Sequence, residues 1–270
     1  MIDRSGILKN SPLVFALAAI RFTSWPLMTK KIDEIHDELR ETLPIILKIR
    51  MQQIGPNNQA VNLNESLQPS AWLLVSSDHS HGIQLSPDQL LVFSKKYERY
   101  ADFETNLKMY LDVLLKHMRL IINVTNCGAR YIDRIKVADN ELFDKYISNT
   151  LLPAKFQKLE PTGGVCISSY KSGGADLRVR CISEPEALSF PDDLVPLLAM
   201  TQEQGKPFEI EQLNRNQFIL DIDAFKNYAV SARMDSDAIL EQLKSLHNVA
   251  NAFFRHEDVC TPHAFRVWKG

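Results

Sequence analysis

The sequence predicts an α+β protein in which long amphipathic helices pack on one face of antiparallel sheet. Helical periodicity is confined to a few long segments, and short strand-like segments separated by Gly, Pro, Asn and Ser turns gather between them. A doubly wound parallel sheet would instead alternate single strands with single helices along the whole chain. The order of strands followed by a helix occurs twice, so we expect two related halves.

The chain opens on a stretch that fits three kinds of segment. Residues 13–20 read LVFALAAI, follow a basic start and meet Arg21. Such a run imitates a secretory signal, but it lacks the ~20 apolar residues of a membrane-spanning helix. Pro12 and Pro26 bound the stretch, and the β-branched and aromatic residues between them favour a strand. We therefore expect a buried strand and a cytoplasmic protein.

Four segments have the apolar spacing of helices. The clearest is 101–122, where apolar residues form one continuous stripe. Residues 29–42 and 237–254 have the same amphipathic pattern, and a short helix is expected at 140–149.

The remaining apolar segments are predicted strands bounded by turn residues. They are 59–63, 72–76, 82–85, 89–94, 129–137, 165–170, 175–182, 208–223 and 264–268. Residues 184–207 carry four prolines and are expected to be irregular. Pro and Gly at both ends of 153–164 place the internal boundary there, which divides one compact unit into halves 1–155 and 156–270.

Composition narrows the function classes. The chain has 270 residues, of which 45% are hydrophobic and 24% charged, which are ordinary globular values. A net charge of -2 argues against a dedicated nucleic-acid binder, which needs a basic surface. The four scattered cysteines predict reduced thiols rather than a disulfide framework. The sequence contains no local nucleophile motif and no phosphate-binding loop, so we favour a protein that is not an enzyme and holds no cofactor.

Arginines alternate along two predicted strands and so share strand faces. On 129–137 the cations take one face, and Asp133 falls on the other with the apolar residues. Guanidinium groups bind carboxylate or phosphate in a bidentate manner. The alternative is that they pair within the protein with acids on the strand 208–223. The predicted binding residues are Arg21, Arg130, Arg134, Arg178 and Arg180.

The triplet Asp221-Ile222-Asp223 places two carboxylates on one face at the end of an apolar strand. Hard oxygen ligands of this kind hold divalent cations. Asp221 and Asp223 are therefore the candidate metal ligands, and the alternative is that they form the polar side of an amphipathic strand.

Several motifs, taken in order, resemble a known family. They are PLVFAL at 12–17 with IRF at 20–22, GARYIDRI at 128–135, DID at 221–223, LH at 246–247, FF at 253–254 and Trp268. The pattern is similar to a sporadically distributed bacterial family of uncharacterised proteins over nearly the full chain, although Asp133 stands where that family usually carries Asn. The resemblance implies no reaction, cofactor or catalytic residue. Sporadic distribution is typical of accessory genes, including phage-defence and toxin–antitoxin components.

The sequence leaves more than one function class open. The preferred hypothesis is a non-enzymatic cytoplasmic interaction protein that binds a protein partner within a phage-defence or toxin-control module. The alternative is a nucleic-acid or nucleotide-binding protein, such as a metal-dependent nuclease that holds its cation with Asp221 and Asp223. A small-ligand pocket between sheet and helices is a third hypothesis, and a homodimer is a further alternative.

Overall fold

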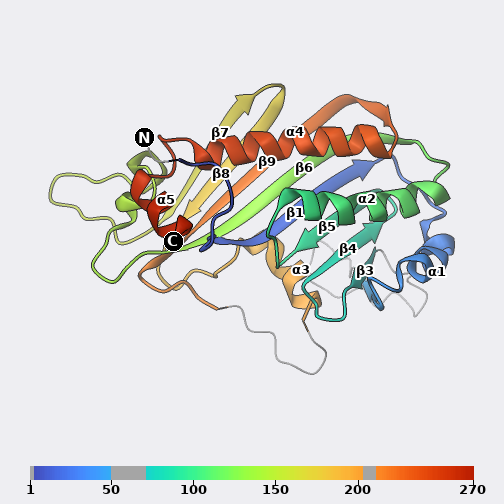
Figure 1. Ribbon diagram of the computed structural model, residues 1–270, viewed down its shortest axis with the longest axis horizontal. Helices are drawn as coiled ribbons and strands as arrows, with labels where there is room; N and C mark the ends of the chain where they lie inside the picture. The colour runs from blue at the N-terminus through green and yellow to red at the C-terminus, as the bar shows by residue number, and fades with distance from the viewer. Residues whose placement is uncertain (1–2, 50–70, 203–210) are drawn as a thin grey trace, which may run out of the picture.

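The computed structural model describes residues 3–49, 71–202 and 211–270, and these form a single nine-stranded antiparallel sheet with helices on both faces (Figure 1). The strands are β1 Leu13–Phe22, β2 Ile45–Ile49, β3 Ala71–Val75, β4 His81–Ser86, β5 Gln89–Ser94, β6 Ile122–Lys136, β7 Val165–Ser172, β8 Ala175–Ile182 and β9 Gln217–Met234. The helices are α1 Met28–Leu39, α2 Tyr100–His117, α3 Val195–Met200, α4 Ser236–Arg255 and α5 Pro262–Lys269, and the 3-10 turns are η1 Phe143–Lys145, η2 Asn149–Leu151 and η3 Asp192–Leu194. The predicted α+β class with antiparallel sheet is confirmed.

The strand order has an internal repetition. It runs β2-β3-β4-β5-β1-β6-β9-β8-β7, so β1 and β6 form the central antiparallel pair. Outward from β1 the next strand is β5, which is followed in the chain by α2, and outward from β6 the next strand is β9, which is followed by α4. The two sides of the sheet thus share the strand-then-helix order expected of related halves, while the boundary between residues 155 and 156 stays a prediction.

The apolar opening stretch is strand β1. Phe15, Ala16 and Ile20 are fully buried, and β1 is hydrogen-bonded on both sides, to β5 and to β6. The strand prediction is confirmed. Because side chains alternate along β1, they pack into the apolar cores on both faces of the sheet. Among the described residues, none of the helices combines the length and apolar character needed to span a membrane.

The long helices α1, α2 and α4 pack on one side of the sheet, which we call the helix face (Figure 1). Their apolar stripes account for this, since α4 buries Leu243, Leu246 and Ala250 against β6 and β9. The prediction that the long helices share one face is confirmed. The opposite side, which we call the α3 face, is covered over part of its area by η3 and α3.

Several boundaries differ from the predictions. The helix predicted at 101–122 ends at His117, because Arg119 and Leu120 adopt positive φ values of 64 and 70. The apolar pattern of the helix continues into Ile121 and Ile122, although these residues lie beyond its end. Ile122 is the first residue of β6, so this strand starts seven residues before the predicted position 129. The helix predicted at 140–149 is wrong, because that segment forms only the short turns η1 and η2.

The strand predicted at 264–268 is wrong, because this segment is helix α5. Thr261 caps the helix by accepting a hydrogen bond from the amide of Ala264 at 3.1 Å, and Pro262 occupies the first turn. The spacing of the buried residues Ala264, Phe265 and Trp268 is helical.

Strand β2 and helix α3 were not predicted. The strand predicted at 59–63 lies outside the described residues, and the one predicted at 208–223 is β9, which begins at Gln217 and runs to Met234.

Candidate functional site

The charged residues predicted to bind lie on one side of the sheet, the α3 face. Successive side chains along a strand point to opposite faces, and Phe15, Ile132 and Ile219, which alternate in step with these residues, pack against α3. The register places Arg130 opposite Asp223 and Arg180 opposite Asp221. The α3 face therefore carries Arg21, Arg130, Arg134, Arg178, Arg180, Asp221 and Asp223.

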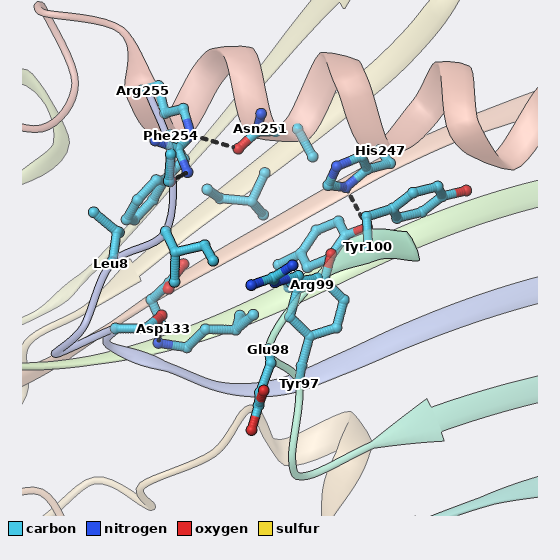
Figure 2. Close-up of a pocket in the computed structure, with 17 residues that line it drawn as sticks. Leu8, Tyr97, Glu98, Arg99, Tyr100, Asp133, His247, Asn251, Phe254 and Arg255 are labelled. Carbon is cyan, nitrogen blue, oxygen red and sulfur yellow. Dashed lines mark hydrogen bonds between the residues drawn. The ribbon is translucent and has the colours of Figure 1, made fainter. Parts of the chain in front are cut away.

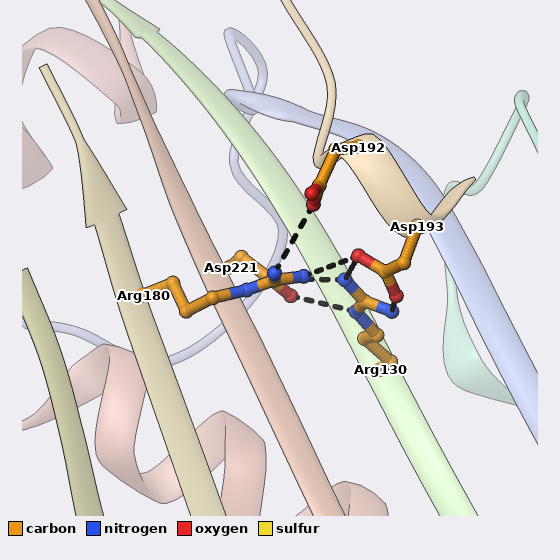
Figure 3. A network of polar contacts seen from close by, with 5 residues as sticks. All are labelled: Arg130, Arg180, Asp192, Asp193 and Asp221. Carbon is orange, nitrogen blue, oxygen red and sulfur yellow. Dashed lines mark hydrogen bonds and ion pairs between the residues drawn. The ribbon is translucent and has the colours of Figure 1, made fainter. Parts of the chain in front are cut away.

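Two of these arginines are held in a closed ring of ion pairs (Figure 3). Arg130 donates from Nε to Asp221 Oδ1 at 2.8 Å and from Nη1 to Asp193 Oδ2 at 2.6 Å. Arg180 donates from Nε to Asp221 Oδ2 at 2.7 Å and from Nη2 to Asp193 Oδ1 at 2.6 Å. Asp192 adds a longer ion pair to Arg180 at 3.6 Å. The structure therefore shows the alternative to ligand binding, in which these arginines pair with acids of the same chain.

Hydrogen bonds within the ring favour the ionised forms of Arg130, Arg180 and Asp193. Burial opposes the charge of Arg130, but hydrogen bonds to Asp193 and Asp221 outweigh burial and raise the pKa of Arg130 above its ordinary value. Burial likewise opposes the charge of Asp193, and hydrogen bonds from Arg130 and Arg180 hold the pKa of Asp193 well below its usual range. Since Asp193 belongs to η3, the ring fastens η3 and α3 to the sheet. The ring is a structural clamp.

The candidate metal ligands do not form a cation site in this arrangement. Both carboxylate oxygens of Asp221 accept hydrogen bonds from arginines. Burial raises the pKa of Asp223 to about 6, against the opposing charge of Arg130. Across residues 3–49, 71–202 and 211–270, no group of three or more His, Cys, Asp or Glu side chains is close enough together to hold a metal ion.

The other three predicted binding arginines lie nearer the surface. Arg134 pairs with Glu211 at 2.9 Å, and Arg178 is exposed, with its guanidinium 6.0 Å from the ring centroid of Phe225. Arg21 is exposed on β1. Of the five predicted binding arginines, Arg21 and Arg178 are therefore the two that are exposed for contact with a partner.

A cavity of about 240 Å³ lies on the helix face, between the sheet and α4 (Figure 2). Its floor is Asp133 on β6, and α4 supplies His247, Phe254 and Arg255 from above. Asp133 is 3% exposed, and within the described residues nothing donates a hydrogen bond to its carboxyl group. Burial, followed by the negative charge of Asp221 across the sheet, raises the pKa of Asp133 to about 8. An unpaired buried carboxyl group in a cavity is a candidate ligand contact.

Aromatic rings form the wall beside Asp133. Tyr131 and His247 share a hydrogen bond of 2.8 Å between Oη and Nδ1, and the ring of Tyr100 stacks on His247 with centroids 4.0 Å apart. The Tyr97 ring meets Tyr131 edge to face at 5.9 Å. Burial, followed by the positive charge of Arg255, lowers the pKa of His247 to about 4, so this imidazole is neutral.

The N-terminal segment closes one side of the cavity, where Gly6, Ile7 and Leu8 line it. Arg255 holds this segment by donating hydrogen bonds to the carbonyl oxygens of Arg4 and Gly6. β1 then enters the sheet with a register shift between Leu13 and Phe15, and Leu13 pairs with Asp133. The sequence carried one signal for this site, which is an acid on the apolar face of β6.

The edge of the sheet at β7 is the other notable surface. Within the described residues, β7 has a strand neighbour, β8, on one side only. Val165, Ile167 and Tyr170 are 50%, 62% and 43% exposed along it. Arg178 on β8 lies opposite Ser169, so an exposed cation stands beside this apolar edge. An exposed apolar edge strand of this kind is a template for pairing with another strand.

Comparison of the chain with protein-family models and with curated proteins found no match to either. The resemblance to the sporadically distributed bacterial family therefore stays a prediction from the motifs.

Proposed function

We propose that this protein is a non-enzymatic cytoplasmic interaction protein that binds a protein partner by strand addition at β7. The observation that carries the proposal is the open edge of β7 with its exposed apolar side chains Val165 and Ile167. Edge strands recognise extended segments through main-chain hydrogen bonds, and side-chain contacts at alternate positions give specificity.

The chemistry of the edge describes the partner. Val165 and Ile167 point to the α3 face, where Arg178 is exposed on the neighbouring strand. A complementary strand would therefore present apolar side chains on that face together with an acidic residue near Arg178. Membership of a phage-defence or toxin-control module is part of the proposal and rests on the resemblance of the motifs alone.

We do not propose the metal-dependent nuclease as a second function. That hypothesis needs Asp221 and Asp223 for a cation and the basic strand faces, which include Arg130 and Arg180, for phosphate. Asp221, Arg130 and Arg180 are already engaged. These three residues hydrogen-bond one another or Asp193.

The test compares protein recovered from lysate of the native host with three tagged baits. These are the wild-type chain, Ile167→Lys on β7, and the control Val230→Lys on β9, where Val230 is 83% exposed. We expect one partner to be enriched by wild type and by Val230→Lys and to be lost with Ile167→Lys, because a lysine blocks apolar edge pairing. Equal melting temperatures of the three baits establish that the lysine acts on binding and leaves the fold intact.

Recovery of the same proteins by all three baits would contradict the β7 proposal. So would a concentration-dependent dimer in light scattering that Ile167→Lys abolishes, since the edge would then pair with a second copy of this chain.

A further inference from the structure

We propose that the cavity under α4 is a binding site for a small organic cation, whose ammonium group pairs with the carboxylate of Asp133 among the surrounding aromatic rings. This site is separate from the β7 edge and does not depend on the proposed protein partner. It consists of the cavity, the buried acid Asp133 and the aromatic side chains that line the cavity.

The acid is the first argument. A carboxylate removed from water is costly unless it is paired with a cation or hydrogen-bonded. Asp221, the other buried acid of the sheet, receives arginine hydrogen bonds from Arg130 and Arg180. Asp133 is 3% exposed and has no such partner within the described residues. A cation that entered the cavity would supply the partner that the described part of the chain does not provide.

The aromatic side chains that line the cavity favour an organic ammonium ion over an inorganic cation. Tyr97, Tyr131, His247 and Phe254 line the cavity, and the faces of aromatic rings attract ammonium groups, most strongly where water is excluded. An inorganic cation would need several oxygen ligands, and among the described residues no acidic cluster stands beside Asp133. An organic ammonium ion needs only one carboxylate and aromatic surface, which is what the cavity offers.

The charged groups that face the cavity do not already neutralise Asp133. Arg255 on α4 is engaged with Asn251 and with the carbonyl oxygens of the N-terminal segment. Glu98 and Arg99, in the segment before α2, are exposed residues of the lining, and neither is among the groups that shift the pKa of Asp133. The neutral imidazole of His247 adds no positive charge.

Pairing with an ammonium group has a distinctive signature. Burial raises the pKa of Asp133 to about 8, which favours the protonated acid near pH 7 when no cation is bound. An ammonium ligand binds the ionised carboxylate, so binding releases about one proton to the buffer. A ligand that hydrogen-bonds to the neutral acid releases none.

The experiment is titration calorimetry at pH 7 in two buffers of different ionisation enthalpy. The probes are benzylammonium, tyramine and putrescine, and benzyl alcohol is the uncharged match of benzylammonium. The proteins are the wild type, Asp133→Asn as the isosteric test variant, and Ile167→Lys as a control outside the cavity.

We expect saturable binding of at least one ammonium probe to the wild type with proton release. Asp133→Asn should weaken it about tenfold or more, because a charge-assisted hydrogen bond is lost. Ile167→Lys should bind like the wild type, whatever its effect on a protein partner.

Three outcomes would overturn the proposal. They are no binding of any ammonium probe, equal affinity for benzyl alcohol and benzylammonium, and undiminished binding by Asp133→Asn. Saturable binding of benzyl alcohol without proton release, in the absence of ammonium binding, would assign the cavity to a neutral aromatic ligand instead.

Discussion

Two buried aspartates on opposite faces of the sheet illustrate two ways in which a fold accommodates a carboxyl group. Asp221 is 1% exposed and Asp133 is 3% exposed. Asp221 stays paired with Arg130 and Arg180, which offset the loss of hydration. Among the described residues no cation pairs with Asp133, and burial raises its pKa to about 8, which favours the protonated form. The neighbourhood of each side chain, and not its residue type, decides its charge.

The protonation of Asp133 predicts how stability depends on pH. Its ordinary pKa is 3.8 and its pKa in the folded protein is about 8, so between these values the folded state holds a proton that the unfolded state has lost. The contribution of this group to stability therefore falls as pH rises from about 4 to 8. Asp133→Asn removes the dependence and should be more stable than wild type at pH 8 by on the order of a few kcal/mol.

Urea unfolding at pH 5 and at pH 8 checks this prediction. The difference in unfolding free energy between the two proteins should grow toward pH 8, because all other titrating groups are shared. A difference that does not change with pH would show that Asp133 is already ionised in the folded protein.

At the scale of elements, the sequence predictions were accurate where a segment repeats a clear apolar period. The segments now seen as α1, α4 and β8 had clear periodicity, and their bounds were close to the predictions. The predicted boundaries were wrong where a helical apolar pattern runs directly into a strand pattern. α2 and β6 are joined by apolar residues that suit both, and the turn at Arg119 and Leu120 has no glycine to mark it.

Two glycines in strands give a matched test of close packing. A Cβ atom at Gly82 in β4 would lie 2.3 Å from the carbonyl oxygen of Leu74 and 2.9 Å from a ring carbon of Phe93. A Cβ atom at Gly128 in β6 would meet nothing closer than 3.7 Å. Gly82→Ala should therefore destabilise the protein by roughly 1–3 kcal/mol, while Gly128→Ala should be neutral or slightly stabilising.

Thermal unfolding of the two glycine variants beside the wild type measures the difference. Equal melting temperatures would mean that β4 shifts to admit the methyl group without loss of packing.

At the scale of the whole molecule, the central pair β1–β6 joins the two sides into one sheet. The core on the helix face is continuous and includes Leu74 on β3 and Val179 on β8, near opposite ends of the strand order. The two sides of the described sheet are not separated at its centre, because β1 and β6 are hydrogen-bonded to each other along most of β1.

Continuity of the core predicts a single cooperative unfolding transition. Leu74→Ala and Val179→Ala each remove fully buried methyl groups and should lower the same transition, the leucine variant by about 2–5 kcal/mol. Calorimetry should give equal calorimetric and van't Hoff enthalpies for the wild type and both variants. A variant that splits the transition into two would show that the halves unfold separately.

The candidate site was only partly predictable, for reasons of topology. Side-chain alternation grouped Arg130 and Arg180 each on the polar face of its own strand, and Asp221 with Asp223 on theirs, but it could not show that these strand faces meet. It could not reveal Asp193, because this residue reaches the ring on a proline-rich segment without periodicity. The cavity was harder still to predict from the sequence, because the residues that surround Asp133 come from α4 and from the first residues of the described chain.

The two ends of the described chain meet beside this cavity. Lys269 pairs with Asp3 at 2.7 Å, and the amide of Asn10 donates to the carbonyl oxygen of Trp268. An affinity tag fused to Gly270 would therefore begin next to Lys9 and Asn10, close to the N-terminal residues that line the cavity. Histidine tags in particular should be removed before any titration with amines.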